Sequence, residues 1–367
     1  MKICAVISPH GFGHASRAVA VLEALYQKLP NLQIDIFTSV PEWFFRDSFK
    51  EENFRYFYFE TDIGVVQQNP LQEDLPGTIE RLKSFIPFGE EKVKYLVKLF
   101  KQNDYQLVLC DISPLGISAA KQAEIPAVLI ENFTWDWIYA GYLNLEPRFL
   151  PFIEPLRDIF LQADYHIQTE PVCEYMQADL ITSPVSRQPR TPREQMRELL
   201  KIGLFQSVVL ITMGGIPQAV EQLQPLRRFP DVVFVIPGAS ESYERRGNLI
   251  LLPHHHSYYH PDLVHTSDVV VGKLGYSTIA EAYHAGVPYI YIPRDHFRET
   301  QPLASFVERE LGGVRIEQDA FFSNKWLDVL PQMLSKPRKS GRRANGAQQI
   351  AEFISERLGL WLFHPTN

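Results

Sequence analysis

A histidine preceded by two glycines lies directly after the first apolar run of the chain, in the segment 9–17. Gly11 and Gly13 permit a tight turn and a close approach of the backbone, and they place His14 near the start of a helix. An imidazole with a reference pKa of about 6.5 can accept a hydroxyl proton near neutrality, which typically accelerates a reaction ~10²–10⁴-fold. His14 is therefore a candidate general base, and the alternative is a loop histidine that bonds only backbone groups.

Asp111 follows another buried apolar run, residues 107–110. Ligands of open parallel sheets bind beyond the carboxyl ends of the strands, so we expect this carboxylate to face the same crevice as His14. A carboxylate that bonds one imidazole nitrogen fixes the tautomer, stabilises the imidazolium and raises the basicity of the other nitrogen. The competing interpretation is that Asp111 caps the helix predicted to begin near Pro114.

A loop that contains two glycines and Lys273 joins a strand to a helix in the second half of the chain. Ser277 and Thr278 open that helix, with Glu281 in a capping arrangement. Capping alone does not account for the glycines and the lysine. A helix N-terminus behind such a loop presents free N–H groups and the positive end of the helix dipole, which suits a diphosphate, and Lys273 adds a full positive charge.

A second glycine loop, with Gly214 and Gly215, follows the apolar run 207–213. By itself it is also typical of an ordinary turn between a strand and a helix. Together the two loops predict one phosphate site on the second half of the chain, where it would serve a leaving group.

The elements that must position these residues are short apolar runs that alternate with helical patterns, which is typical of parallel α/β sheets. The position three after Gly13 is Ser16 rather than glycine, which disfavours a dinucleotide-binding dehydrogenase. The predicted strands are residues 3–7, 34–38, 54–59, 107–110, 127–130, 165–168, 207–213, 232–236, 249–252, 268–271 and 289–292. The predicted helices are residues 16–28, 90–101, 116–122, 218–228, 278–284, 303–309 and 342–362.

A proline-rich segment without apolar periodicity separates two such series, so the sequence predicts two facing, doubly wound Rossmann-like domains with a cleft between them. We expect an acceptor-side domain over 1–183, a linker over 184–195 and a donor domain over 196–345. A C-terminal helix, 346–367, is expected to pack across both domains. The linker arginines, Arg187, Arg190 and Arg193, are expected to be solvated.

Composition excludes several classes of protein. The 367 residues contain 45% hydrophobic and 22% charged side chains, as in ordinary globular proteins, and the net charge of −7 argues against a nucleic-acid partner. Three scattered cysteines predict buried thiols in a reducing compartment, and we expect a cytoplasmic protein. No run reaches the ~18 apolar residues of a membrane helix, and residues 1–8 predict a buried strand rather than a signal peptide. Peripheral membrane contact stays open.

Two further groups have competing interpretations. The histidines at 254–256 and His260 suggest a metal site, but the run lacks cysteine and periodic spacing, so we expect no metal and assign this loop to a nucleotide base instead. Trp135 and Asp136 would line an acceptor pocket, since aromatic rings stack on sugar faces, or would equally pack against the first sheet.

The second half resembles the donor domain of GT-B-type glycosyltransferases, the group with plant and macrolide glycosyltransferases and the peptidoglycan N-acetylglucosaminyltransferase. The resemblance rests on residues 275–282 and 286–288 and on Gln301, and on residues 11–14 with Asp111 in the first half. Most of the chain also resembles the glycosyltransferase-like N-terminal segment of plant L-arabinokinase, in residues 10–17, 132–140 and 272–278. We expect no kinase domain to follow.

The resemblance implies a role for each matching residue. Glu281 would bind the ribose hydroxyls, and Gln301, with Glu299, would touch the donor sugar, although these two are not adjacent as in the family pattern. The diphosphate would lie on a set of residues shared by the two loops: Gly214, Gly215, Lys273, Gly275, Tyr276, Ser277 and Thr278.

These features predict a hexosyltransferase-type enzyme that moves a sugar from a nucleotide diphosphosugar, UDP-linked by resemblance, to a hydroxyl of a lipid, saccharide or metabolite. The reaction would invert configuration and need no cofactor or metal beyond the nucleotide sugar as co-substrate. Two alternatives stay open: a non-catalytic nucleotide-sugar sensor or assembly protein of the same fold, and a sugar-nucleotide epimerase.

Overall fold

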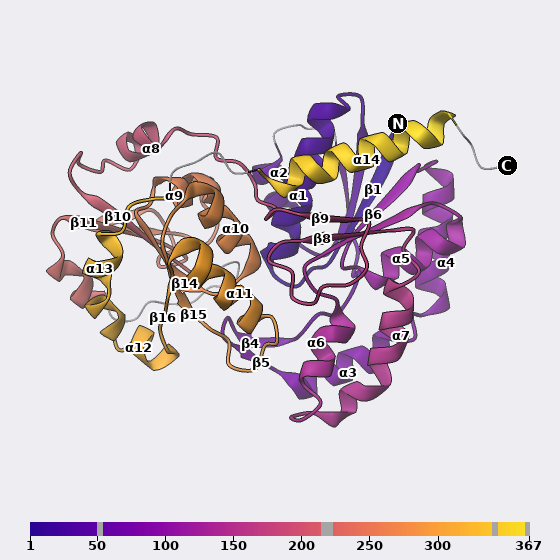
Figure 1. Ribbon diagram of the computed structural model, residues 1–367, viewed down its shortest axis with the longest axis horizontal. Coiled ribbons are helices and arrows are strands. Elements are labelled where there is room, and N and C mark those ends of the chain that lie inside the picture. The colour runs from indigo at the N-terminus through magenta and orange to yellow at the C-terminus, as the bar shows by residue number, and fades with distance from the viewer. Residues whose placement is uncertain (50–53, 214–222, 340–343, 364–367) are drawn as a thin grey trace.

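The computed structural model describes residues 1–49, 54–213, 223–339 and 344–363, with the side chains of 360–363 left aside (Figure 1). Two seven-stranded sheets form the centres of two α/β domains, in the orders β3-β2-β1-β6-β7-β8-β9 and β12-β13-β11-β10-β14-β15-β16. All neighbours pair in parallel except β12 with β13. The predicted fold class, two doubly wound parallel-sheet domains, is confirmed.

The first-sheet strands are β1 (Lys2–Ile7), β2 (Gln33–Thr38), β3 (Phe54–Tyr58), β6 (Leu107–Asp111), β7 (Ala127–Glu131), β8 (Tyr165–Thr169) and β9 (Leu180–Thr182). The second-sheet strands are β10 (Ser207–Thr212), β11 (Val232–Pro237), β12 (Glu244–Arg246), β13 (Leu249–Leu252), β14 (Val269–Lys273), β15 (Tyr289–Ile292) and β16 (Val314–Arg315). The helices are α1 (Phe12–Lys28), α2 (Glu42–Ser48), α3 (Leu75–Phe85), α4 (Glu90–Gln102), α5 (Pro114–Ala123), α6 (Trp135–Gly141), α7 (Leu150–Phe160), α8 (Arg193–Leu199), α9 (His260–Thr266), α10 (Tyr276–Ala285), α11 (Thr300–Phe306), α12 (Gln318–Phe322), α13 (Leu330–Leu334) and α14 (Gly346–Phe363).

All eleven apolar runs predicted as strands are strands. The central ones are buried on both faces of a sheet that helices cover, whereas β3, at the edge of the first sheet, is half-exposed. The predicted helix 303–309 is α11, which continues into one π-helical turn over Val307–Leu311. Part of the predicted helix 218–228 lies outside the described residues, and Gln224–Arg228 is a 3₁₀ turn. Among the described helices, none is long and apolar enough to cross a membrane.

The C-terminal helix α14 returns from the second domain to the first (Figure 1). Its buried apolar side chains, among them Ile350 and Ile354, join the first-domain core with α1, and α14 also contacts β9. The described apolar face of α14 thus packs on the first domain rather than across both. The reason is that this face packs against apolar side chains of α1, while Asn345, just before the helix, donates to the backbone carbonyl of Ser186 in the linker (2.7 Å).

The linker prediction needs one correction, because Arg187 is buried and Arg190 and Arg193 are only partly exposed. β9 ends at Thr182 and α8 begins at Arg193, on either side of the segment that joins the domains. Arg187 is 6% exposed, and its guanidinium donates to Ser48 of the first domain (2.9 Å) and to a carboxylate of the second. Arg190 donates to Glu23 of the first domain (2.8 Å) and lies 4.1 Å from the ring centre of Tyr259 in the second. These side chains therefore connect the two domains.

A small hairpin of the first domain, β4 (Gln67–Asn69) with β5 (Gln72–Glu73), reaches the second domain (Figure 1). Leu71 at its turn is 2% exposed and belongs to the hydrophobic core of the second domain, together with Ile211 and Ile292. The hairpin therefore fastens the two domains at one end of the cleft.

Replacing Leu71 by alanine should weaken this fastening. We expect the free energy that holds the hairpin on the second domain to fall by about 2 kcal/mol, the low end for a buried leucine. The hairpin can leave its pocket while both domain cores stay folded. Hydrogen exchange should accelerate at residues 67–73 and at the facing ends of β10 and β15. Substitution of Leu145, which is 55% exposed, is the matched control. Unchanged exchange in the hairpin would contradict this fastening.

Candidate active site between the domains

A cavity of about 1020 Å³ lies between the two domains. The first domain lines it with the glycine loop before α1 and with side chains of α2. The second domain lines it with the ends of β10 and β14, the first turn of α10 and the loop after β13. The glycine loop and α10 approach each other closely, because a Cβ on Gly13 would lie 3.9 Å from Ser277 Oγ. The crevice predicted from the strand ends is therefore one shared cavity.

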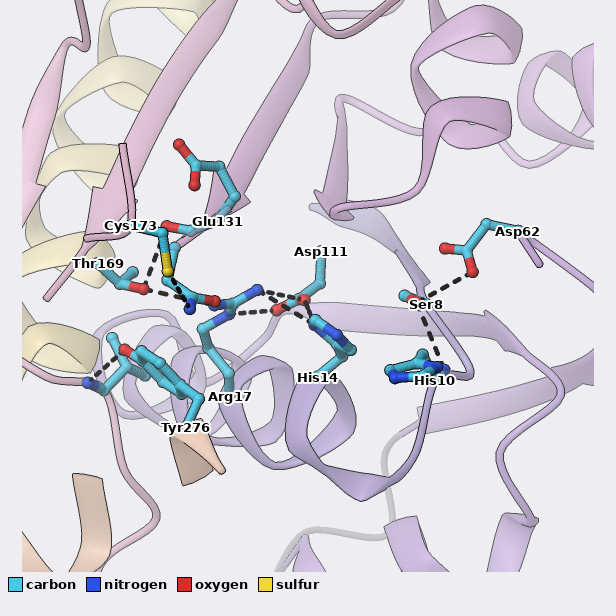
Figure 2. Close-up of polar contacts among 12 residues, drawn as sticks. Ser8, His10, His14, Arg17, Asp62, Asp111, Glu131, Thr169, Cys173 and Tyr276 are labelled. Atoms are coloured by element: carbon cyan, nitrogen blue, oxygen red, sulfur yellow. Dashed lines mark hydrogen bonds and ion pairs between the residues drawn. The ribbon is translucent and has the colours of Figure 1, made fainter. Parts of the chain in front are cut away.

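His14 and Asp111 meet at this cavity, as the sequence predicts (Figure 2). Strands β1 and β6 are neighbours with Ile7 opposite Asp111, so the residues that follow β1 lie beside the carboxyl end of β6. The Nδ1 atom of His14 is 3.0 Å from Asp111 Oδ1, and His14, although only 7% exposed, lines the cavity. Ser113, not Asp111, caps the following helix, with its hydroxyl accepting from the Gly116 N–H.

Arg17 is a third member of this group, and sequence reasoning missed it (Figure 2). Its guanidinium donates to both oxygens of Asp111 (2.7 and 2.8 Å) and to Asn132 (2.6 Å), and it is 1% exposed. Burial acts to raise the pKa of Asp111, but the charge of Arg17 holds that pKa below its usual value. The one available signal is spacing, since a residue three positions after His14 lies on the same helix face.

The first turn of α10 opens toward the cavity without a side-chain cap. Gly275 is its N-cap residue, and the expected capping arrangement with Glu281 is absent among the described contacts. Ser277 and Thr278 both line the cavity. The uncapped N–H groups and the helix dipole are suited to a negatively charged group at this point.

Two cations line the same cavity. Lys273 lines the cavity, and its ammonium group makes no hydrogen bond or ion pair with any residue that the structure describes. Burial, followed by the charge of Arg294, lowers the pKa of Lys273 to about 7. Arg294, which the sequence did not single out, is 4% exposed and 3.3 Å from Glu299 Oε2. Glu299 also accepts from Asn132 of the first domain (2.9 Å), so this cluster bridges the cleft.

Comparison with known proteins identifies the fold. Residues 234–357 match the Glycosyltransferase family 28 C-terminal domain. UGT89C1 of Arabidopsis thaliana, solved with UDP, superposes with a TM-score of 0.63 at 13% identity, over 98% of this chain and 99% of that chain. MurG of Acinetobacter baumannii superposes with a TM-score of 0.58 at 17% identity, over 97% of this chain and 99% of that chain. The chain has the GT-B glycosyltransferase fold.

A curated relative covers nearly the whole chain. L-arabinokinase of Arabidopsis thaliana is 27% identical over 356 residues, which is 95% of this chain and 34% of that protein. The chain therefore spans about a third of the length of this relative. The resemblances to GT-B glycosyltransferases and to L-arabinokinase that the sequence suggests are both confirmed.

In this GT-B fold, the donor-side residues expected from the sequence do not all reach the cavity. Glu281 is 4% exposed and is not among the described residues that line the cavity. Gln301, on α11, is exposed and does not line it either, whereas Glu299 and Tyr276 do. Gly214 and Gly215 lie outside the described residues.

The expected acceptor-side aromatic residue packs in the core of the GT-B first domain. Trp135 is 1% exposed, with its ring centroid 5.1 Å from that of His10, and the nearby Asp136 accepts from Arg157 (3.3 Å). Neither is among the described residues that line the cavity, so of the two interpretations the structure favours packing against the first sheet. The segment after β7 is apolar on the side that faces the sheet, which explains this burial.

The histidine-rich loop after β13 forms one wall of the cleft. His254, His255, His256 and His260 all line the cavity. His255 packs against Trp43 of the first domain, with ring centroids 4.4 Å apart, and its Nε2 lies 2.8 Å from Asp47 Oδ2. In the described part of the chain, no group of three or more histidine, cysteine or acidic side chains could hold a metal ion.

Proposed function

We propose that the chain transfers a hexose from a nucleotide diphosphosugar, most simply UDP-linked, to a hydroxyl acceptor, with inversion and without a metal. One observation carries the proposal: the His14–Asp111 pair and the uncapped first turn of α10 open on the same interdomain cavity. The likeness of the second domain to the family 28 C-terminal domain and the UDP found with UGT89C1 support the choice of donor.

His14 acts as the general base in this reaction. Asp111 bonds Nδ1, which holds the proton on that nitrogen and leaves the lone pair of Nε2 for the acceptor. The acceptor hydroxyl gives its proton to Nε2, and its oxygen forms a bond to the anomeric carbon. The bond from that carbon to the diphosphate breaks, and its electron pair leaves with the diphosphate. Attack from the face opposite the leaving group inverts configuration.

The leaving diphosphate gains negative charge as the bond breaks. Lys273 and the N–H groups at the start of α10 stabilise this charge, in the place where a metal ion would otherwise act. Arg294 lines the same cavity and adds a second positive charge there.

The binding of UDP should weaken as the pH rises from 6 to 8. The pKa of Lys273 is lowered to about 7, so the free protein loses the ammonium charge across this interval. A diphosphate binds the protonated form, and each proton lost from Lys273 therefore costs affinity. We expect about a tenfold higher Kd at pH 8 than at pH 6, measured by calorimetry. In Lys273→Met the Kd for UDP should depend little on pH. A steep pH dependence in that variant would show that another group causes it.

A two-stage experiment tests the proposal. Calorimetric titration with UDP- and GDP-sugars first identifies the donor, and a transfer assay with lipid, saccharide and metabolite acceptors then follows release of the nucleoside diphosphate. Release of the nucleoside diphosphate that requires both the donor and an acceptor supports the transferase function. Product from the donor alone would indicate an epimerase. Absence of binding to every nucleotide sugar would contradict the proposal.

A second function, a non-catalytic nucleotide-sugar sensor, is favoured by one observation. Arg17 donates to the same Asp111 oxygen that bonds His14, at 2.7 Å, so part of the carboxylate charge is already compensated. Arg17 thus competes with His14 for this carboxylate oxygen, which disfavours a catalytic role for the His14–Asp111 pair. Tight nucleotide-sugar binding without turnover across the acceptor panel would support the sensor.

For either function, we propose a reducing, cytoplasmic location, because the protein has three free cysteines, two of them buried.

A further inference from the structure

The carboxylate of Glu281 is fully engaged by two neighbouring side chains. Its Oε1 accepts from Nε and Nη2 of Arg187, at 3.2 and 2.9 Å, and its Oε2 lies 2.7 Å from Nδ1 of His260. The side chain of Glu281 is 2% exposed. A ribose in the cavity would therefore not meet Glu281 itself in this arrangement.

Arg187 holds Glu281 in this position from the far side. Its Nη1 donates to Ser48 Oγ (2.9 Å), and its guanidinium lies 5.2 Å from the ring centres of both Phe44 and Tyr259. If Glu281 turned toward the cavity, a guanidinium that is 6% exposed would lose its carboxylate partner. Breaking one side of a buried ion pair is strongly unfavourable, so Glu281 is held in place.

His260 lies between Glu281 and the cavity. It is the first residue of α9, which packs on α10. Its side chain is 25% exposed, whereas that of Glu281 is 2% exposed. Because Nδ1 bonds the carboxylate, the proton of a neutral imidazole stays on Nδ1 and Nε2 is an acceptor. The nearest described partner of Nε2 is the hydroxyl of Thr212, at 3.5 Å, and Thr212 lines the cavity too.

The position of His260 along the cavity matches the ribose of a nucleotide. The α10 turn with Ser277 and Thr278 forms the proposed diphosphate site, and the loop with residues 254–258 forms the wall that we assign to the base. A ribose joins these two groups in every nucleoside diphosphate. His260 comes directly after residues 254–259 in the sequence. It is also hydrogen-bonded to Glu281 of α10, the helix whose first turn forms the proposed diphosphate site.

We propose that His260 binds the nucleotide ribose, with Nε2 accepting a hydrogen bond from a 2′- or 3′-hydroxyl, and that Glu281 and Arg187 are positioning residues for this imidazole. The proposal rests on the proposed function, since it requires a nucleotide in the cavity. It replaces the direct contact of Glu281 with ribose that the family resemblance implies. The site therefore discriminates ribonucleotides from deoxyribonucleotides through a histidine that a buried ion pair orients.

The test compares calorimetric Kd values for UDP, 2′-deoxy-UDP and 3′-deoxy-UDP. We expect the unsubstituted protein to bind UDP about 3- to 10-fold more tightly than at least one of the deoxy analogues, as for one hydrogen bond. In His260→Ala this ratio should fall to about one while the affinity for that analogue stays nearly unchanged. His256→Ala is the matched control, because His256 lines the same cavity without contacting Glu281, and any loss there should fall equally on all three ligands.

The outcomes separate the two proposals. Binding of UDP with an unchanged ratio in His260→Ala would overturn the role of His260 and leave the proposed function intact. Loss of the ratio in Glu281→Gln but not in His260→Ala would show that Glu281 contacts the ribose itself. Absence of UDP binding by the folded, unsubstituted protein, together with absence of binding to other nucleotides, would overturn both. Thermal unfolding of each variant shows that it is folded.

Discussion

Replacing His14 by alanine is expected to lower kcat for glycosyl transfer by about 10²–10⁴-fold, while the Kd for UDP changes less than about twofold. The substitution removes the group that accepts the hydroxyl proton in the transition state and leaves the α10 turn and Lys273 in place. Asp111 keeps its two bonds to Arg17, so the floor of the cleft stays folded. Calorimetry with UDP and a transfer assay on the same preparation measure the two quantities.

The comparison of turnover with UDP binding, rather than the size of the fall in kcat, identifies the role of His14. A fall in turnover with intact nucleotide binding assigns His14 to the chemical step. Loss of UDP binding as well would indicate that His14 holds the donor, and unchanged turnover would exclude it as the base. Asp111→Asn is an informative companion, since an amide keeps a hydrogen bond to the imidazole but loses the charge that stabilises the imidazolium.

Replacing Arg17 by methionine is expected to lower the free energy of unfolding by about 3–5 kcal/mol, the usual cost of breaking one side of a buried ion pair. Asp111 is 3% exposed and would keep its negative charge with only His14 beside it. Asn132 would also lose its donor, and with it part of the support for Glu299 across the cleft. Urea unfolding followed by circular dichroism measures the change.

Two variants serve as controls for Arg17→Met. The Arg46–Glu42 pair has the same chemistry, but both side chains are 47% exposed, so Arg46→Met should cost only about 0.3–0.5 kcal/mol. Adding Asp111→Asn to Arg17→Met should recover part of the loss, because the unpaired buried charge is gone. Equal costs for the buried and the exposed pair would contradict the assigned importance of Arg17.

The sequence alone determined the architecture and one half of the chemistry. Each apolar run such as 107–110 is a local property of the chain, and burial on both faces of a parallel sheet requires such a run whatever its neighbours are. The meeting of His14 with Asp111 followed from the same logic, because residues after parallel strands gather at one edge. Short elements carried no comparable signal, so β4, β5, β9, β12 and β16 were missed.

Only the tertiary structure decided which charged residues are buried and with which partner. Arg17 and Arg187 look like ordinary polar residues in the sequence, and each is buried through a carboxylate 94 positions away in the chain. The same long-range pairing turns Glu281 away from the cavity and places His260 in front of it. A charged side chain can be buried only where the fold brings an opposite charge to it, and that condition depends on distant residues rather than on local pattern.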